Sequence, residues 1–225
     1  MADDPTHETP ETWETATRLV RGGTARSAFG ETAEALFLTQ SYVYGSAESA
    51  DARFSGEEPG FVYARYGNPT VKMFEDRLAL LEGAQTCRAQ ASGMASVNLA
   101  LMGLLKAGDH VVAGRALFGS CRWILNVWAP RFGIETTFVD APDANAWRNA
   151  VRPNTTVFLI ESPANPLLEM TDIVAVSAIA ATAAMSVISS SGLAGLSMNT
   201  TLVFGRIAAF QAAVSAASTK VVSTP

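Results

Sequence analysis

The sequence predicts an α/β protein with a mainly parallel sheet. Three short apolar runs alternate with helical patterns in the middle of the chain: HVVAG (110–114), ETTFVD (135–140) and TVFLIES (156–162). Strands that alternate with helices are typical of βαβ units, in which helical crossovers join parallel strands. Ligands of such sheets bind at the carboxyl ends of the strands. The residues that directly follow the three runs are therefore the first candidates for a site.

The helices are predicted from their start and stop signals. Asn68 and Pro69 begin a helix that Gly83 ends, with apolar residues at helical spacing between them. Ser92 begins a second helix, which is expected to reach a stop at Gly108. Three more helices are expected in SCRWILNVWAPRFG (120–133), in DANAWRNAV (143–151) and from about Asp172.

The region before the first of these helices is less regular. Residues 1–14 are polar and acidic and are expected to form a disordered arm. The stretch ETAEALFLT (31–39) has a short helical pattern, and ESADARFSGEEPGF (48–61) is expected to be a loop because it is polar and rich in turn formers.

Composition excludes several function classes. The 225 residues carry a formal charge of −5 without a run of like charges, so no nucleic-acid or anionic membrane partner is indicated. Cys87 and Cys121 lie far apart and the histidines are His7 and His110, a set that favours neither a metal site nor a disulfide framework. The most apolar window, 174–188, is too short to span a bilayer, and no secretory leader opens the chain. A soluble, cytoplasmic protein is expected.

Three stretches carry residues that could hold a ligand, and each also has a plain structural explanation. In ASGMAS (91–96), the amides at a helix start could bind an anion, or Ser92 could simply cap the helix. In LFGSC (117–121), Phe118 could cover a flat ligand or pack in the core. In ESPANP (161–166), Asn165 offers a side-chain amide, although two prolines could also serve a rigid turn.

A fourth stretch, YARYGNPT (63–70), places Tyr63 and Arg65 before a helix without a structural role for either. Together, in this order, the four stretches resemble the Cys/Met-metabolism family of pyridoxal-phosphate-dependent enzymes. The segment VRGGTARSAFGETAEALFLTQSYVYGSA (20–47) is most similar to the O-succinylhomoserine sulfhydrylase branch. The resemblance runs from about residue 17 to about residue 179. It implies fold type I, the aspartate-aminotransferase-like fold, with an incomplete large domain.

The resemblance also implies a site for pyridoxal 5'-phosphate that is shared between subunits of a homodimer or homotetramer. Tyr63 and Arg65 would reach into the neighbouring subunit and hold the cofactor phosphate, and a guanidinium suits phosphate because it offers a rigid fork of donors. The remaining implied contacts are the backbone amides of Gly93 and Met94 on the phosphate, the ring of Phe118 on the pyridine ring, and Asn165 near the cofactor and the substrate carboxylate.

The implied reaction converts O-succinylhomoserine and sulfide to homocysteine, a step of methionine biosynthesis. A cystathionine γ-synthase, a γ- or β-lyase of the same family, and a non-catalytic product remain alternatives. The family's cofactor also requires a lysine that binds it covalently and an acidic partner for its ring nitrogen.

The last part of the sequence departs from the family pattern. Relatives carry Asp-Asn and later Ser-x-Thr-Lys-His, whereas this chain has MSVISSSGLAG (185–195) and no acidic residue after Asp172. ASTK (217–220) echoes the lysine motif in part, which makes Lys220 the candidate catalytic lysine. The expected organisation is an arm and dimer-contact segment at 1–60, a partial cofactor-binding domain at 61–179 and a divergent tail at 180–225. The family's C-terminal domain is expected to be absent and the chain to be an inactive fragment.

Overall fold

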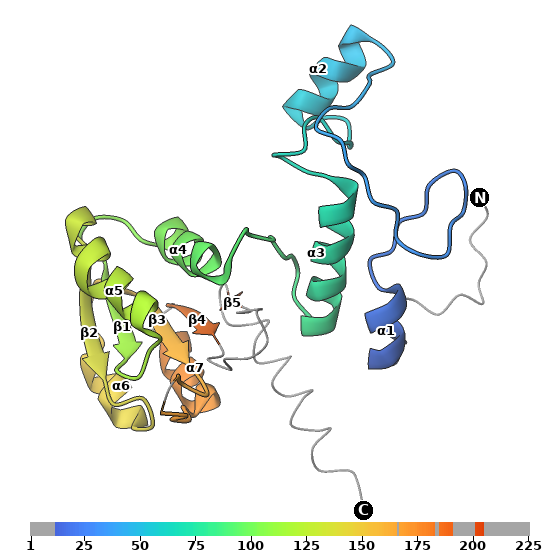
Figure 1. Cartoon of the computed structure of the whole chain (residues 1–225). Coiled ribbons are helices and arrows are strands. Elements are labelled where there is room, and N and C mark those ends of the chain that lie inside the picture. The colour runs from blue at the N-terminus through green and yellow to red at the C-terminus, as the bar shows by residue number, and fades with distance from the viewer. Residues whose placement is uncertain (1–11, 166, 183–184, 191–200, 205–225) are drawn as a thin grey trace, which may run out of the picture. The chain divides into compact units, whose positions relative to one another are not determined.

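A computed structural model gives the fold (Figure 1) and describes residues 12–165, 167–182, 185–190 and 201–204. Backbone contacts divide the chain into two compact units, residues 1–89 and 90–225. The domain boundary expected near residue 60 stays a prediction.

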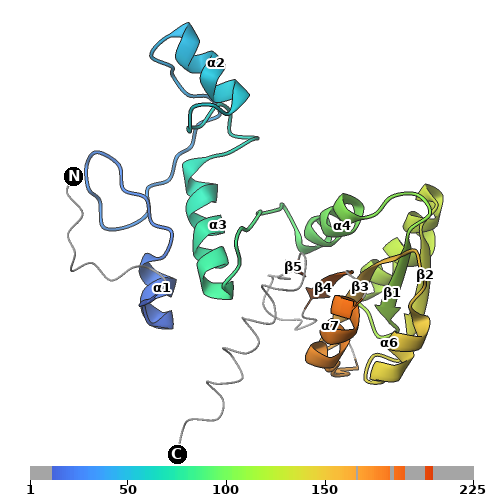
Figure 2. The same cartoon turned by 180° about the vertical axis from the view of Figure 1, so that it is seen from behind.

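The second unit is built on a five-stranded sheet with strand order β2-β1-β3-β4-β5 (Figure 2). Its strands are β1 (His110–Gly114), β2 (Glu135–Val139), β3 (Thr155–Glu161), β4 (Ser186–Ser190) and β5 (Thr201–Phe204). The first four strands pair in parallel, and β5 runs antiparallel to β4 at the edge. Both neighbours of β1 follow it along the chain, and this is the arrangement that helical crossovers produce. The predicted α/β class with a mainly parallel sheet is confirmed.

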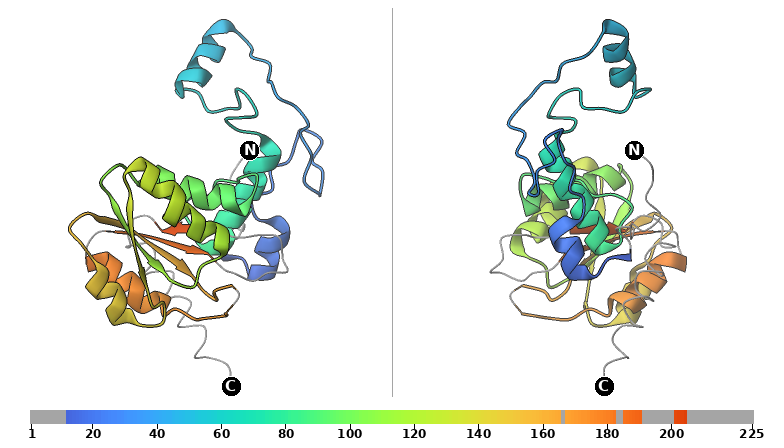
Figure 3. Two further views of the ribbon diagram at one scale, coloured as in Figure 1. Left: turned by 60° about the vertical axis from the view of Figure 1, so that its left-hand side comes forward. Right: turned by 90° about the vertical axis from the view of Figure 1, so that its right-hand side faces the viewer.

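Helices cover both faces of this sheet (Figure 3). On one face lie α4 (Gly93–Leu104) and α5 (Gly119–Trp123), and on the other lie α6 (Ala144–Ala150) and α7 (Ile173–Thr182). Alternate strand residues serve the two faces, because side chains along a strand point in opposite directions. Val111 and Leu159 therefore join the core under α4 and α5, whereas Val112 and Phe158 join the core under α6 and α7. Trp147 of α6 is fully buried in the second core and donates its indole N–H to the carbonyl oxygen of Ala141 at 3.0 Å.

Two predicted helices differ in detail from the structure. The helix that begins after Ser92 ends at Leu104, because Asp109 folds the next residues into a turn by accepting the N–H of Lys106 at 2.9 Å. The predicted helix at 120–133 is helical up to Phe132, but its hydrogen-bonding pattern changes along the chain. After α5 come a π-helix, η2 (Ile124–Trp128), and a 3₁₀-helix, η3 (Ala129–Phe132), which ends at Gly133 in the left-handed conformation.

At the amino end of the sheet, His110 of β1 is hydrogen-bonded to both neighbouring strands. His110, fully buried at the start of β1, contacts Thr155 Oγ1 through Nδ1 at 2.8 Å and Thr137 Oγ1 through Nε2 at 2.9 Å. The same two hydroxyl groups accept hydrogen bonds from Arg152, which also pairs with Glu135. Burial, and next the positive charge of Arg152, lower the pKa of His110 below its ordinary 6.5, while Glu135 opposes this shift. The neutral imidazole is therefore the form that this fold favours.

The first unit contains α1 (Thr15–Arg21), α2 (Ala47–Ser55) and α3 (Pro69–Glu82). The bounds of α3 agree with the prediction, since Asn68 caps its start and Gly83 ends it in the left-handed conformation. The prediction of a loop over 48–61 is wrong for its first half, because α2 begins behind a Ser46 cap and Arg53 pairs with Glu58 beyond its end.

The predicted short helix at 31–39 is also wrong. This stretch contains no helix, although its Ala, Leu and Glu residues are good helix formers. Its backbone is bonded elsewhere: the N–H of Phe37 donates to Thr70 Oγ1 at 2.8 Å, and its carbonyl accepts from Asn68 Nδ2 at 2.9 Å. Tertiary hydrogen bonds have replaced the local helical ones.

Candidate functional site

One buried carboxylate joins the two loops that leave the carboxyl ends of β1 and β3. Glu161, the last residue of β3, is 3% exposed. Its Oε2 accepts the backbone N–H of Phe118 at 2.8 Å, and its Oε1 accepts the backbone N–H of Asn165 at 2.9 Å. The structure thus brings Phe118 and Asn165 to the same edge of the sheet.

The start of α4 lies next to α5, the helix that begins directly after Phe118. Met94 Sδ lies 4.0 Å from Cys121 Sγ, and Met94 packs against the core of that face. Ser92 Oγ accepts the N–H of Ala95 at 3.1 Å and so caps the helix as predicted. The first amides of a helix have no acceptor within it, so those of Gly93 and Met94 are the donors left for an anion.

Cys121 is present as a neutral thiol and not as the reactive thiolate. Burial, and secondarily the negative charge of Glu161, raise the pKa of Cys121 to about 11. At neutral pH the group is therefore protonated and behaves as a small apolar side chain.

The side chains of Phe118 and Asn165 are left available for a ligand. Phe118 is 39% exposed, and the side-chain amide of Asn165 has no hydrogen bond with any described residue. The loop that carries Asn165 is closed on itself, because Ala164 donates to the carbonyl oxygen of Glu169 and Leu168 donates to that of Ala164. The peptide bond between Ser162 and Pro163 in this loop is cis.

A second group of candidate residues lies in the first unit. The guanidinium carbon of Arg65 lies 5.3 Å from the ring centre of Tyr63 and 5.1 Å from that of Tyr66. Arg65 is exposed, and none of the ion pairs among the described residues includes it. The two rings hold this guanidinium by cation–π contacts and leave its N–H donors open.

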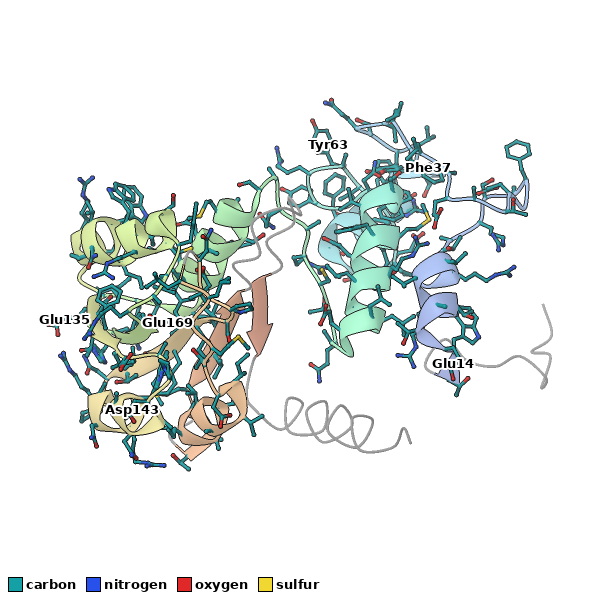
Figure 4. All side chains as sticks on the ribbon, turned by 60° about the horizontal axis from the view of Figure 1, so that its bottom comes forward. Glu14, Phe37, Tyr63, Glu135, Asp143 and Glu169 are labelled. Carbon is teal, nitrogen blue, oxygen red and sulfur yellow. The ribbon has the colours of Figure 1, made fainter. Side chains whose placement is uncertain are left out.

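The backbone around Arg65 is fixed by the segment that precedes α2. Ala64 donates to the carbonyl oxygen of Gln40 at 2.9 Å, and the hydroxyl of Tyr44 donates to that of Val62 at 2.9 Å. Figure 4 labels Phe37 and Tyr63 on the two segments that meet near the start of α3. Asn68 joins these segments, since its side chain caps α3 and also donates to Phe37.

The structure gathers only part of the predicted site in one unit. Met94, Phe118 and Asn165 lie at one edge of the sheet, whereas Tyr63 and Arg65 belong to the first unit, and Lys220 lies outside the described residues. The roles of these residues toward a cofactor stay predictions. No group of three or more metal-ligating side chains occurs in the part of the chain that the structure describes.

Sequence reasoning missed Glu161. The residue stands in the stretch ESPANP, in which a role was predicted only for Asn165 and the two prolines. A charged residue at the end of an otherwise apolar strand was the available signal, because a buried carboxylate requires donors close by.

The chain belongs to the family of Cys/Met metabolism PLP-dependent enzymes, whose family model matches residues 16–206. The family's cofactor is pyridoxal 5'-phosphate, as the motifs predicted, and its members act in sulfur amino-acid metabolism. The predicted family and fold type are both confirmed.

Among its relatives is O-succinylhomoserine sulfhydrylase of Mycobacterium tuberculosis, 48% identical over 181 residues, which are 79% of this chain and 45% of the relative. L-Methionine gamma-lyase of Porphyromonas gingivalis is 41% identical over 72% of this chain and 40% of its own length. A crystal structure of a Campylobacter jejuni protein assigned as an O-acetylhomoserine (thiol)-lyase, with N'-pyridoxyl-lysine-5'-monophosphate, aligns with a TM-score of 0.75 and 27% identity over 79% of this chain and 44% of that one. The chain spans less than half the length of the curated relatives it matches.

None of the helices in the described ranges has both the length and the apolar composition that crossing a bilayer requires. The cytoplasmic location expected from the sequence stays a prediction.

Proposed function

We propose that this chain carries the phosphate- and ring-binding part of a pyridoxal 5'-phosphate site of the O-succinylhomoserine sulfhydrylase type. The observation that carries the proposal is the link through Glu161, which holds Phe118 and Asn165 at one edge of the sheet beside the start of α4. A phosphate, an aromatic ring and a carboxylate each find a suitable group there: helix amides, a half-exposed phenyl ring and an unpaired side-chain amide.

The phosphate would be held from two directions. The amides of Gly93 and Met94 and the dipole of α4 supply one side of its site. Arg65 and Tyr63 of a second chain supply the other, so the functional form is a homodimer or a higher oligomer. This assignment is supported by the exposure of Arg65 and by the two rings that orient it without neutralising its charge.

When bound, pyridoxal 5'-phosphate supplies an electron sink for bonds at the α-carbon of an amino acid. The ring of Phe118 would cover one face of the cofactor and keep water from it. Asn165 would orient the cofactor and the carboxylate of the amino-acid substrate with the side-chain amide that it leaves open.

The substrate class that the relatives favour is an O-acylated homoserine, with sulfide as the second reactant. The chain is 48% identical to the Mycobacterium tuberculosis sulfhydrylase and 41% identical to the Porphyromonas gingivalis lyase. A γ-lyase of the same family is therefore the second candidate. Each activity is proposed for a full-length protein of this family, because the present chain matches less than half the length of either relative.

We further propose that the 225-residue chain does not itself catalyse sulfhydrylation. Strand β4 ends at Ser189 and Ser190, beside Glu161 in the parallel register, and no acidic residue follows Asp172. Without a carboxylate on this strand, no group there holds a proton at the ring nitrogen. Lys220 follows in an Ala- and Ser-rich sequence that lacks the rest of the family's lysine motif.

The binding test compares the wild-type chain with Arg65→Ala in a titration with pyridoxal 5'-phosphate. Loss of a charge-assisted hydrogen bond should cost about 1.5–3 kcal/mol, which is a roughly 10- to 150-fold weaker affinity. Arg131→Ala is the matched control, because Arg131 is also exposed and also lies over an aromatic ring, that of Trp128. Equal affinities of wild type and Arg65→Ala would remove Arg65 from the site.

The catalytic test adds borohydride to the cofactor-loaded chain and maps any labelled lysine. We expect no stoichiometric label and no homocysteine from O-succinylhomoserine and sulfide. A label at Lys220 together with homocysteine formation would show that ASTK is the working lysine motif and that the chain is an enzyme.

A further inference from the structure

The side chain of Glu161 lies at a position from which it reaches both candidate loops. Strand β3 pairs with β1 on one side and with β4 on the other, so its last residue lies between the loop after β1 and the loop that follows β3 itself. One oxygen of Glu161 reaches Phe118, 43 residues earlier in the chain, and the other reaches Asn165, four residues later.

Both hydrogen bonds are made to backbone N–H groups. Glu161 thereby fixes where Phe118 and Asn165 lie without occupying either side chain. Packing alone does not fix Phe118, because this residue is 39% exposed, and the side-chain amide of Asn165 has no partner among the described residues. A buried carboxylate is costly unless donors surround it, and these two amides are its donors among the described residues.

We infer that Glu161 is a positioning residue, whose carboxylate sets the spacing between the ring of Phe118 and the side chain of Asn165 across the cofactor edge of the sheet. The inference rests on the proposed function, since it concerns the same site. No hydrogen bond among the described residues joins Glu161 to the start of α4, so removal of its carboxylate should weaken the hold on the pyridine ring and leave the hold on phosphate unchanged.

The experiment uses the 225-residue chain and compares wild type with Glu161→Gln and Glu161→Ala. Glu135→Gln is the matched control: it also removes a carboxylate from a strand terminus, but at the opposite end of the sheet. Hydrogen exchange of the Phe118 and Asn165 amides is measured by NMR. Affinity is then titrated with two probes, pyridoxal 5'-phosphate and inorganic phosphate.

In Glu161→Ala both amides should exchange at least about tenfold faster, because each loses a charge-assisted bond. Glu161→Gln keeps one acceptor oxygen, so only one of the two amides should stay protected. Both variants should bind pyridoxal 5'-phosphate about tenfold more weakly and inorganic phosphate as the wild type does. The control should match the wild type in all measurements.

Two results would overturn the inference: unchanged exchange in Glu161→Ala, or an equal loss of both probes in Glu161→Gln. The second result would mean that the residue serves only to keep the unit folded. A wild-type chain that binds no pyridoxal 5'-phosphate contradicts the proposed function instead, and the exchange data still decide whether Glu161 couples the two loops.

Discussion

The two units of this chain are held together in different ways. The second unit has an apolar core on each face of its sheet. In the first unit, the described residues 12–89 include only three buried ones, Gly22, Asn68 and Met73. Many of its large apolar side chains are exposed instead, among them Phe29, Leu36, Leu38 and Val43.

The difference shows what each unit requires. The second unit is stabilised by the apolar side chains that it buries on both faces of its sheet. The first is organised by hydrogen bonds between side chains, such as those of Asn68 and Thr70, and the backbone of other segments. Its exposed apolar side chains suit a surface that another molecule covers, which agrees with the proposed oligomer.

The largest effect is expected from emptying the core of the second unit. Trp147→Ala should lower the free energy of unfolding by about 3–5 kcal/mol, because it removes a fully buried side chain and its hydrogen bond to Ala141. Urea unfolding followed by circular dichroism measures the loss. Trp123→Ala, at an exposed tryptophan of α5, should cost about 1 kcal/mol or less. Equal losses of unfolding free energy in the two variants would show that Trp147 does not belong to a packed core.

A smaller loss is expected from the residue that organises the first unit. Asn68→Ala should cost about 1–3 kcal/mol, since it removes the cap of α3 and leaves the carbonyl oxygen of Phe37 without its donor. Faster amide exchange in the first turn of α3 would report the loss locally. Asn149→Ala, at an exposed position of α6, is the control and should stay within about 0.5 kcal/mol. Unchanged amide exchange in the first turn of α3 in Asn68→Ala would show that the Asn68 side chain does not stabilise this unit.

The stability of the second unit should also depend on pH through His110. Its pKa is lowered in the folded state, so the unfolded chain takes up the proton first as the pH falls. Stability should be complete above about pH 6.5, the ordinary value, and decrease below it. The free energy of unfolding is measured between pH 5 and pH 8 for wild type and His110→Gln. The variant should be less stable but should show a flatter dependence in this range, and parallel curves would exclude His110 as the cause.

The smallest effect on folding is expected at the exposed apolar residues of the first unit. Leu38 is 96% exposed, so Leu38→Ser should change the free energy of unfolding of the single chain by no more than about 0.5 kcal/mol. It should nevertheless weaken self-association, measured by analytical ultracentrifugation. Leu167→Ser, at an exposed leucine of the second unit, should leave association unchanged. A Leu38→Ser chain that associates as the wild type does would remove this side chain from the subunit contact.

The sequence predicted the second unit better than the first. In the second unit, strands β1 to β3 and the starts of α4 and α7 are marked by local signals, namely apolar runs and capping residues, whereas α3 is the one helix of the first unit with correctly predicted bounds. In the first unit the decisive bonds are not local. The 31–39 stretch has the composition of a helix, but Asn68 and Thr70, about thirty residues later, take its backbone into an extended path.

The candidate site shows the same division. Phe118 and Asn165 could be found because each follows a strand, where ligands of parallel sheets bind. The charge at the end of an apolar strand marks Glu161 as unusual, but its role does not follow from that signal, because it depends on two loops that come together only in the folded sheet.

The bond between Glu161 and Phe118 also sets an order of events during synthesis. The acceptor of the Phe118 amide is made 43 residues later, so at 5–20 residues per second the amide waits about 2–9 s for it. During that interval the Phe118 N–H can donate its hydrogen bond to water or to other parts of the nascent chain. The edge that carries Phe118 and Asn165 therefore cannot take its final form before Glu161 has been translated, although Phe118 is translated 43 residues earlier.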